Sequence, residues 1–273
     1  MKKYSKLKRS MSVVALVLAV SNPVFANIAN WTTVGNSGVS TANDGVVIIP
    51  TGFSSVDWIS TAGGVMGNNG GYGGTNGSTV TSNAFSVNAA GSALTFSFDF
   101  ITSDGTTTFP DYAWSNLYNA STNSLVATLF TATTNPNGSA VPGSGAGLPT
   151  ISATINPATV TVATGTGSTV WSPLGAYSGL CYAGYGNGCG NTGWVNASYN
   201  ISNAGSYYLN FGVANASDTL YDSGLAFVGT AVNGTPISPV PEPGEWLMML
   251  SGLGLVGFIA TRRKNQGTNM TYA

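Results

Sequence analysis

The chain has 273 residues, of which 43% are hydrophobic and only 6% are charged, and it contains no histidine. All eight Lys and Arg residues lie within the first nine positions or at positions 262–264, whereas the seven aspartates lie between Asn27 and Val240. A body without basic side chains has no surface for binding phosphate, which argues against nucleic-acid binding. It also lacks the His and Lys that a Ser-His-Asp triad, a Cys-His pair or a Schiff base requires.

The first 26 residues have the three parts of a secretory signal peptide. A basic segment (Met1–Ser10) precedes an apolar segment (Met11–Val20), which is too short to span a bilayer of about 30 Å. Small residues precede an expected cleavage between Ala26 and Asn27. We therefore expect export by the general secretory route, with signal peptidase as a partner.

Residues 27–239 show the pattern of one all-β domain, for which we expect a β-sandwich or a jelly roll. The clearest strand covers Ala93–Ile101, where Leu94, Phe96, Phe98 and Phe100 alternate with polar residues. Further strands are expected at Val46–Ile49, Thr79–Val87, Tyr112–Tyr118, Leu125–Phe130, Ala158–Ala163, Trp194–Ile201, Tyr207–Val213 and Leu225–Val232. The Gly-rich segments Gly63–Gly77 and Asn135–Pro149 are expected to be long loops.

The two cysteines, Cys181 and Cys189, enclose seven residues rich in glycine. In an exported protein such a pair predicts a disulfide, worth roughly 2.5 kcal/mol through loop-closure entropy. Tyr182 and Tyr185 lie within this loop, which is too small to bury both rings, so we expect them to be available for ligand binding. Four tryptophans of the body either fill the core or offer flat faces to sugar rings: Trp58, Trp114, Trp171 and Trp194.

The aspartates form two sequence clusters after predicted strands, Asp99 with Asp104 and Asp218 with Asp222. Carboxylates without a neighbouring cation predict a Ca²⁺ site, because calcium prefers oxygen ligands from such loops. The alternative is that these side chains bond to the backbone of their own turns. Calcium is the one cofactor that the sequence predicts.

The C-terminal segment combines three features within 25 residues. Pro241-Glu242-Pro243 is followed by an apolar segment, expected to form a short transmembrane helix over 246–261, and then by Arg262-Arg263-Lys264. The fifteen residues of the apolar run Trp246–Ala260 span about 22 Å as a helix, close to the hydrocarbon depth of a thin membrane. A basic triplet at its end is typical of the cytoplasmic side of a membrane.

This combination over 240–264 resembles the PEP-CTERM sorting signal, leaving 265–273 as a short tail. The resemblance implies recognition by an exosortase, a membrane enzyme of Gram-negative bacteria, then removal of the tail and delivery to the cell surface. The body also resembles other PEP-CTERM ectodomains in the segments Leu94–Gly105 and Asp218–Leu225. That second resemblance implies no particular activity.

Together these features predict a non-enzymatic protein of the cell surface or extracellular matrix, associated with exopolysaccharide or a biofilm. The main alternative is a calcium-assisted carbohydrate-binding module. Two further alternatives are an ice-binding protein, for which threonine runs such as Thr131–Thr134 are short, and a glycoside hydrolase with two catalytic aspartates.

Overall fold

The computed structural model describes residues 28–104, 108–134, 139–143, 147–182, 189–237 and residue 253. The expected signal peptide and Tyr185 lie outside these residues, as does the sorting signal apart from Leu253. Leu253 is helical and exposed, but no helix among the described residues is long and apolar enough to cross a membrane.

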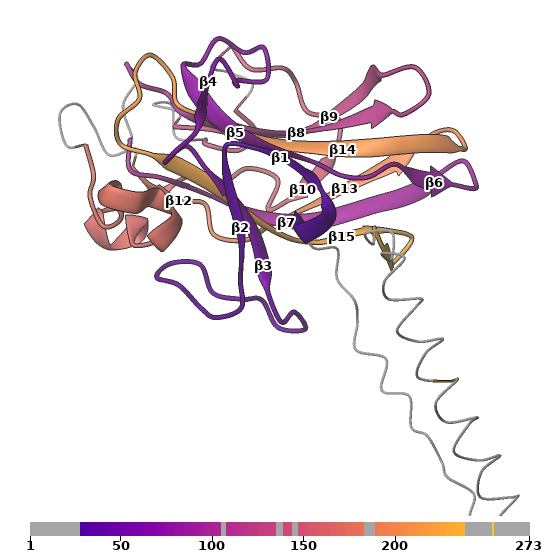
Figure 1. The fold of residues 1–273 in the computed structure, drawn as a ribbon, viewed down its shortest axis with the longest axis horizontal. Helices are drawn as coiled ribbons and strands as arrows, with labels where there is room; N and C mark the ends of the chain where they lie inside the picture. The colour runs from indigo at the N-terminus through magenta and orange to yellow at the C-terminus, as the bar shows by residue number, and fades with distance from the viewer. Residues whose placement is uncertain are drawn as a thin grey trace, which may run out of the picture.

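Two antiparallel sheets form the two layers of the domain (Figure 1). Sheet A has the order β1-β5-β14-β8-β9, with β4 paired to β5 and β6 to β14. Its strands are β1 (Thr32–Val34), β4 (Val65–Met66), β5 (Asn76–Thr81), β6 (Phe85–Val87), β8 (Tyr112–Asn119), β9 (Ser124–Thr133) and β14 (Gly205–Ala214). The predicted all-β sandwich architecture is therefore confirmed.

Sheet B has the order β10-β13-β7-β15-β3-β2, with β12 paired to β7 and β11, and β16 paired to β15. Its strands are β2 (Asn36–Ser40), β3 (Val56–Ser60), β7 (Ser92–Thr102), β10 (Thr154–Asn156), β11 (Ala163–Thr164), β12 (Gly190–Asn191), β13 (Val195–Ile201), β15 (Ser223–Val232) and β16 (Thr235–Pro236). Three 3₁₀ helices complete the described part: η1 (Ile28–Asn30), η3 (Thr166–Thr169) and η4 (Ser172–Tyr177).

The core lies between the sheets and follows from the alternation seen in the sequence. Phe98 of sheet B stacks on Phe130 of sheet A with ring centroids 3.8 Å apart. Phe227 of sheet B stacks on Phe211 of sheet A at 4.3 Å. Trp31, which precedes β1, packs against both rings of the second pair. Aromatic pairs of this kind add about 0.5–1.5 kcal/mol beyond the burial of their area, so they fix how the two layers align.

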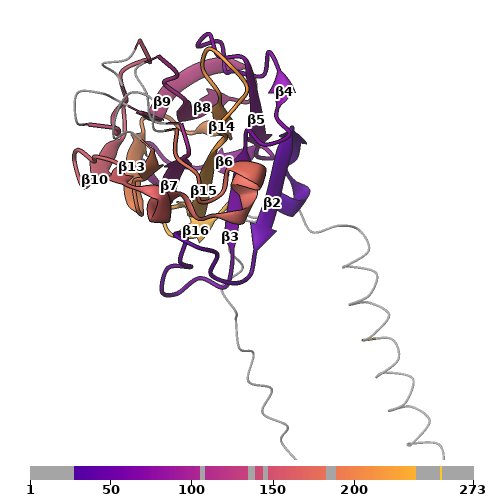
Figure 2. The same cartoon turned by 90° about the vertical axis from the view of Figure 1, so that its left-hand side faces the viewer.

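Both sheets are also covered on parts of their outer faces. Trp171 and Leu174 of the η4 region pack with Val56 and Val228 over sheet B. The coil of this region lies against the strands of sheet B (Figure 2). On sheet A, Trp114 is covered by Tyr72, which comes from the Gly63–Gly77 segment. That segment contains β4 and the start of β5, so the prediction of a long loop there was wrong in part. A chain whose glycines adopt positive φ can turn tightly enough to lie flat on the sheet.

Several predicted strands differ from the structure. Val46–Ile49 is not a strand, because Val47 makes only an isolated bridge to Asp44 and packs into the outer cluster of sheet B. Ala158–Ala163 is also largely non-strand, with a single bridge at Val160. Thr79–Val87 is split between β5 and β6. Only part of the apolar surface of the first two segments is buried: Val47 is buried and Val160 is partly buried, whereas Ile48 and Ala158 are exposed.

Candidate functional site

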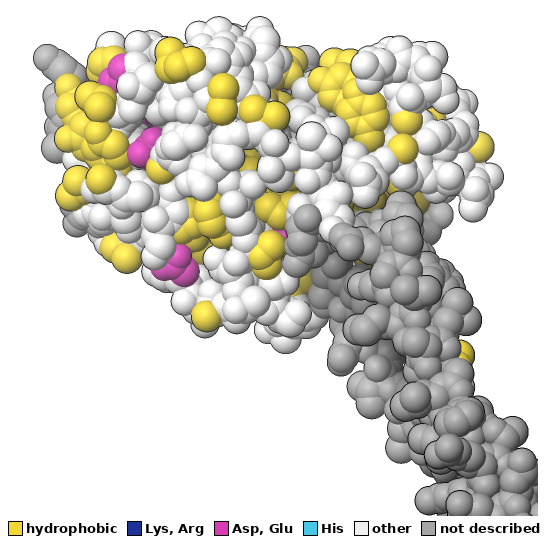
Figure 3. Space-filling view, in the orientation of Figure 1, with side chains coloured by type: hydrophobic (Ala, Val, Ile, Leu, Met, Phe, Trp, Pro, Cys, Tyr) yellow, Lys and Arg dark blue, Asp and Glu magenta, His cyan; other side chains and the backbone are white. Residues whose placement is uncertain are grey.

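The candidate site lies at the end of the sandwich where β7 and β14 end and β8 and β15 begin. We call this region the acidic end and define it by Asp104, Asp111, Asp218 and Asp222. It carries β12 and η4, on the left in Figure 1. Figure 3 shows hydrophobic and acidic side chains together at this end of the visible face. Among the described residues, no Lys, Arg or His accompanies these carboxyls.

Asp111 anchors a continuous chain of hydrogen bonds that joins the two sheets. Its Oδ1 accepts the backbone N–H of Ala216 at 2.9 Å, and its Oδ2 lies 2.6 Å from the Ser223 hydroxyl. The Ser223 hydroxyl also lies 2.7 Å from Thr102 Oγ1. Thr102 in turn donates to the carbonyl oxygen of Asp104 at 2.7 Å. All these groups except Ala216 are at most 1% exposed, so the network is shielded from bulk solvent.

A protonated Asp111 accounts for every short contact in this chain of hydrogen bonds. Ser223 has one hydroxyl hydrogen, and the hydrogen of Thr102 is already used toward Asp104. If Asp111 carries a proton, then Asp111 donates to Ser223 and Ser223 donates to Thr102, so every short contact contains one hydrogen. Burial raises the pKa of Asp111 well above its usual value against the opposing effect of the hydrogen bonds from Ser223 and Ala216, and the nearby charges of Asp104 and Asp218 raise it further.

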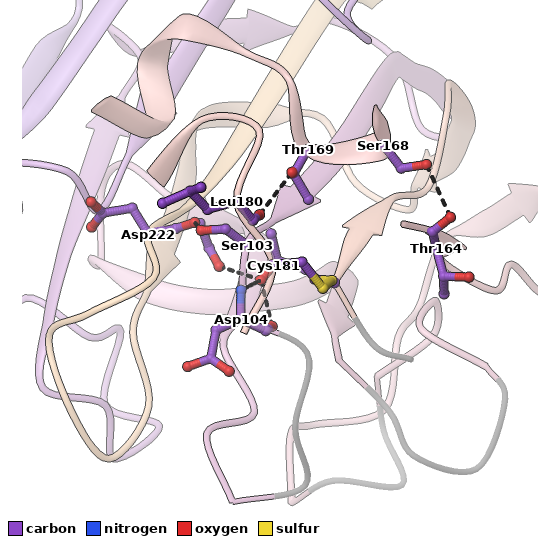
Figure 4. Close-up of a disulfide and its surroundings, with 11 residues drawn as sticks. Ser103, Asp104, Thr164, Ser168, Thr169, Leu180, Cys181 and Asp222 are labelled. Atoms are coloured by element: carbon purple, nitrogen blue, oxygen red, sulfur yellow. Dashed lines mark hydrogen bonds between the residues drawn. A yellow bond between two sulfur atoms is a disulfide. The ribbon is translucent and has the colours of Figure 1, made fainter. Parts of the chain in front are cut away.

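Two other aspartates of the acidic end, Asp222 and Asp218, form hydrogen bonds within the loops that connect the strands there. Thr61 donates to Asp222 Oδ1 at 2.9 Å, and burial raises the pKa of Asp222. The carbonyl oxygen of Asp222 accepts the N–H and the hydroxyl of Ser103 (Figure 4). Asp218 Oδ1 accepts the N–H of Leu220 at 3.0 Å, which is the local turn bonding that the sequence left open as an alternative.

Asp99 does not join the acidic end. Its carboxylate accepts a hydrogen bond from Thr192 at 3.1 Å on the outer side of β7, and burial raises its pKa to about 7. The four aspartates of the predicted calcium site are therefore divided between two places. Among the described residues, no group of three or more acidic or cysteine side chains is placed to hold a metal ion. Calcium binding stays a prediction of the sequence.

The predicted disulfide is present between Cys181 and Cys189, with Cα atoms 5.7 Å apart. It fixes the segment after η4 against the end of β7, where the N–H of Tyr182 donates to the carbonyl oxygen of Ser103 at 3.0 Å. Thr169 donates to the carbonyl oxygen of Leu180 at 2.8 Å and holds the same segment from the other side (Figure 4). The result is a fixed position for Tyr182 at the acidic end.

Tyr182 belongs to a row of four half-exposed aromatic rings. Phe109 meets Tyr182 edge-on at 5.9 Å, Tyr182 meets Tyr221 at 5.0 Å, and Tyr221 meets Tyr177 at 4.9 Å. We call these four residues the aromatic row. None of the three tyrosine hydroxyls bonds to another group within the described part of the chain. Sequence reasoning identified only Tyr182, because Phe109 and Tyr221 are far from it in the chain and Tyr177 lies outside the disulfide loop.

Tyr221 occupies its place in the row at a conformational cost. Its φ is +53°, and Ser217 in the same β14–β15 loop has φ of +70°. Such left-handed conformations cost a non-glycine residue about 1–3 kcal/mol and persist only where surrounding contacts hold them. Here the ring contacts with Tyr177 and Tyr182 supply that support.

The four tryptophans lie outside the core between the sheets. Trp114 and Trp171 are fully buried, but in the clusters on the outer faces of sheet A and sheet B. Trp58 and Trp194 are half-buried on the outer side of sheet B. Trp194 donates its indole N–H to the carbonyl oxygen of Ile48 at 2.8 Å.

Comparison with solved structures finds distant similarity to three domains. The enzymatically active domain of tailspike protein 4 of bacteriophage CBA120 is 14% identical, with a TM-score of 0.32. The match covers 75% of this chain and 20% of that one. The K3 cleaved adhesin domain of Lys-gingipain from Porphyromonas gingivalis is 10% identical, with a TM-score of 0.32. The match covers 74% of this chain and 93% of that domain. The C-terminal family 22 carbohydrate-binding module of Xyn10B from Clostridium thermocellum is 15% identical, with a TM-score of 0.29. The match covers 76% of this chain and 88% of that module.

No curated protein matches the sequence. The C-terminal segment, in contrast, gives a clear match that agrees with its Pro-Glu-Pro, apolar and basic parts. Proteins with this signal are exported and sorted to the cell surface. Residues 239–264 carry the PEP-CTERM protein-sorting motif, which implies processing of the chain by exosortase.

Proposed function

We propose that this exported domain is a non-enzymatic surface or matrix protein that binds extracellular polysaccharide through the aromatic row. The observation that carries the proposal is the row itself, which presents four adjacent half-exposed rings at the end of a rigid sandwich. A disulfide and the β14–β15 loop hold these rings in place without a ligand. Rings that are ordered in advance lose little conformational entropy when they bind.

The chemistry of the row suits a sugar. Each tyrosine combines an apolar face, on which the C–H side of a sugar ring packs, with a hydroxyl that bonds to sugar hydroxyls. The hydroxyls of Tyr177, Tyr182 and Tyr221 are not used within the described part of the chain, so they are available to such a ligand. An apolar protein partner would leave these hydroxyls without bonds, which costs free energy.

The charge of the domain narrows the choice of polymer. Seven aspartates and no basic residue lie between Asn27 and Val240. A polymer of uronates or sulfated sugars would meet carboxylates without any compensating cation, whereas a neutral polysaccharide meets no repulsion. The proposed ligand is therefore an uncharged polysaccharide.

Removal of the Tyr221 ring is expected to weaken binding at least tenfold. The test uses the full chain in a polyoxyethylene detergent, which carries no sugar, and affinity electrophoresis in gels containing mixed-linkage β-glucan, xylan, mannan, dextran or alginate. Tyr221→Ala should bind at least tenfold more weakly than the wild type, about 1.4 kcal/mol, because it interrupts the row at its centre. Alginate, the anionic polymer, should not retard the protein.

Tyr208→Ala is the matched control, since Tyr208 is a half-exposed tyrosine on the outer face of sheet A that stacks on Tyr118. Its affinity should equal that of the wild type. If no neutral polymer binds, or if the Tyr221 and Tyr208 variants bind equally well, the proposal is wrong. Repeating the measurement with a chelator tests the calcium-assisted alternative, and release of reducing ends would establish an enzyme instead.

A further inference from the structure

A groove of about 310 Å³ lies beside η4, outside the acidic end. Trp58 of β3 lines it together with Asn36 and Ser40 of β2, Ser172 of η4 and Asp44 of the connection between β2 and β3. Its volume is at the lower end of the range for small-molecule sites, which favours a ligand of one or two rings.

Trp58 lies flat over β2 because its cross-strand partner is a glycine. Gly38 pairs with Trp58, and a Cβ at Gly38 would come within 2.8 Å of Cε2 of the indole. Trp171 supports the ring edge-on at 6.4 Å. The indole is therefore held in one orientation while it stays half-exposed, and its N–H has no hydrogen-bond partner among the described residues.

The rim of the groove carries fixed polar groups with unused bonding capacity. The Asp44 carboxylate accepts the N–H of Ser172 at 3.1 Å and its hydroxyl at 3.0 Å, one on each oxygen. Both oxygens keep a second lone pair. The amide of Asn36 donates to the carbonyl oxygen of Ala62 at 2.7 Å, which leaves its Oδ1 as an acceptor. The rim thus offers several acceptors and few donors, the pattern that suits a ligand rich in hydroxyl groups.

We propose that this groove is a second carbohydrate subsite, in which one uncharged sugar ring stacks on Trp58 and donates hydroxyl hydrogens to Asp44 and Asn36. The choice of a sugar as ligand rests on the proposed function, but the groove shares no residue with the aromatic row. Both lie along η4, with Ser172 in the groove and Tyr177 in the row. η4 is kinked at Gly175 between these two residues, so the groove and the aromatic row lie on the two halves of one short segment.

The groove is tested with Trp58→Ala and with soluble hexasaccharides of the neutral polymer that binds the wild type best. Calorimetry on the full chain should show affinity at least tenfold weaker for Trp58→Ala, since the variant removes the stacking surface. Trp194→Ala is the matched control, because Trp194 is the other half-buried tryptophan of sheet B and does not line the groove. Its affinity should lie within twofold of the wild type.

A second variant, Ser40→Tyr, fills the groove and leaves Trp58 in place, so it tests the proposal even if Trp58→Ala does not fold. It too should weaken binding about tenfold. Wild-type affinity in Ser40→Tyr together with weak binding in Tyr221→Ala would overturn the groove and leave the aromatic row intact. Failure of every neutral hexasaccharide to bind the wild type would overturn both.

Discussion

The free energy of unfolding is expected to be greatest near pH 4 and to fall by several kcal/mol as the pH rises to 8. Burial raises the pKa of Asp57 and of Asp99 from 3.8 to about 7, and that of Asp111 well above 3.8. Between pH 4 and 7 the unfolded chain has lost protons that the folded protein keeps, so stability decreases with increasing pH. A single carboxyl whose pKa moves from 3.8 to about 7 accounts for roughly 4 kcal/mol.

Urea unfolding at constant ionic strength between pH 3.5 and 8.5, in the presence of a chelator, measures this dependence. Most proteins lose stability toward acid because their carboxylates are paired with cations in the folded state. Here no cation is present among the described residues, so the profile is expected to run in the opposite direction. A free energy that is constant or rises toward pH 8 would show that these carboxyls are ionised in the folded protein.

Asp111→Asn is expected to keep the stability of the wild type at pH 8 or to exceed it, whereas Asp111→Ala should lose about 3 kcal/mol or more. An asparagine reproduces the protonated acid, because its oxygen accepts the N–H of Ala216 and its amide donates to Ser223. Alanine leaves both partners unsatisfied in a buried site. Chemical denaturation of the three proteins at pH 5 and pH 8 measures the difference.

The pH dependence of the same variants provides the control. Asp111→Asn removes one titrating carboxyl, so its stability should decline less between pH 5 and pH 8 than that of the wild type. If Asp111 were ionised and accepted a hydrogen from Ser223, the asparagine variant would instead lose stability at pH 8 as severely as the alanine variant. The comparison therefore decides the protonation state that the hydrogen-bond chain indicates.

The long strands could be predicted because apolar and polar residues alternate along them. Leu94, Phe96, Phe98 and Phe100 alternate along β7, and the structure buries all four in the core. Val46–Ile49 has the same apolar character, but only Val47 is buried, by packing with Trp171 and Leu174 and not by a sheet, and Ile48 is exposed. Hydrophobicity indicates burial, whereas strand formation also requires a neighbouring edge that the local sequence does not specify.

The candidate site could be predicted only in part. Tyr182 was accessible to reasoning because a short disulfide loop cannot bury it. Phe109, Tyr177 and Tyr221 join it only through the pairing of β7 with β15 and of β8 with β14, which depends on the complete topology. The acidity of the body was evident from composition, but the sequence did not indicate that the fold buries five of the seven aspartates. The buried ones are Asp57, Asp99, Asp104, Asp111 and Asp222.

Hydroxyl-radical footprinting with mass spectrometry tests the central claim, polysaccharide binding by the aromatic row, most directly. The full chain is exposed to radicals with and without a saturating neutral polysaccharide, and oxidation is measured at each tyrosine. Tyr177, Tyr182 and Tyr221 are expected to be protected, while Tyr118 and Tyr208, which are also half-exposed, react as before. Unchanged oxidation of the three row tyrosines under saturating polysaccharide would contradict the account.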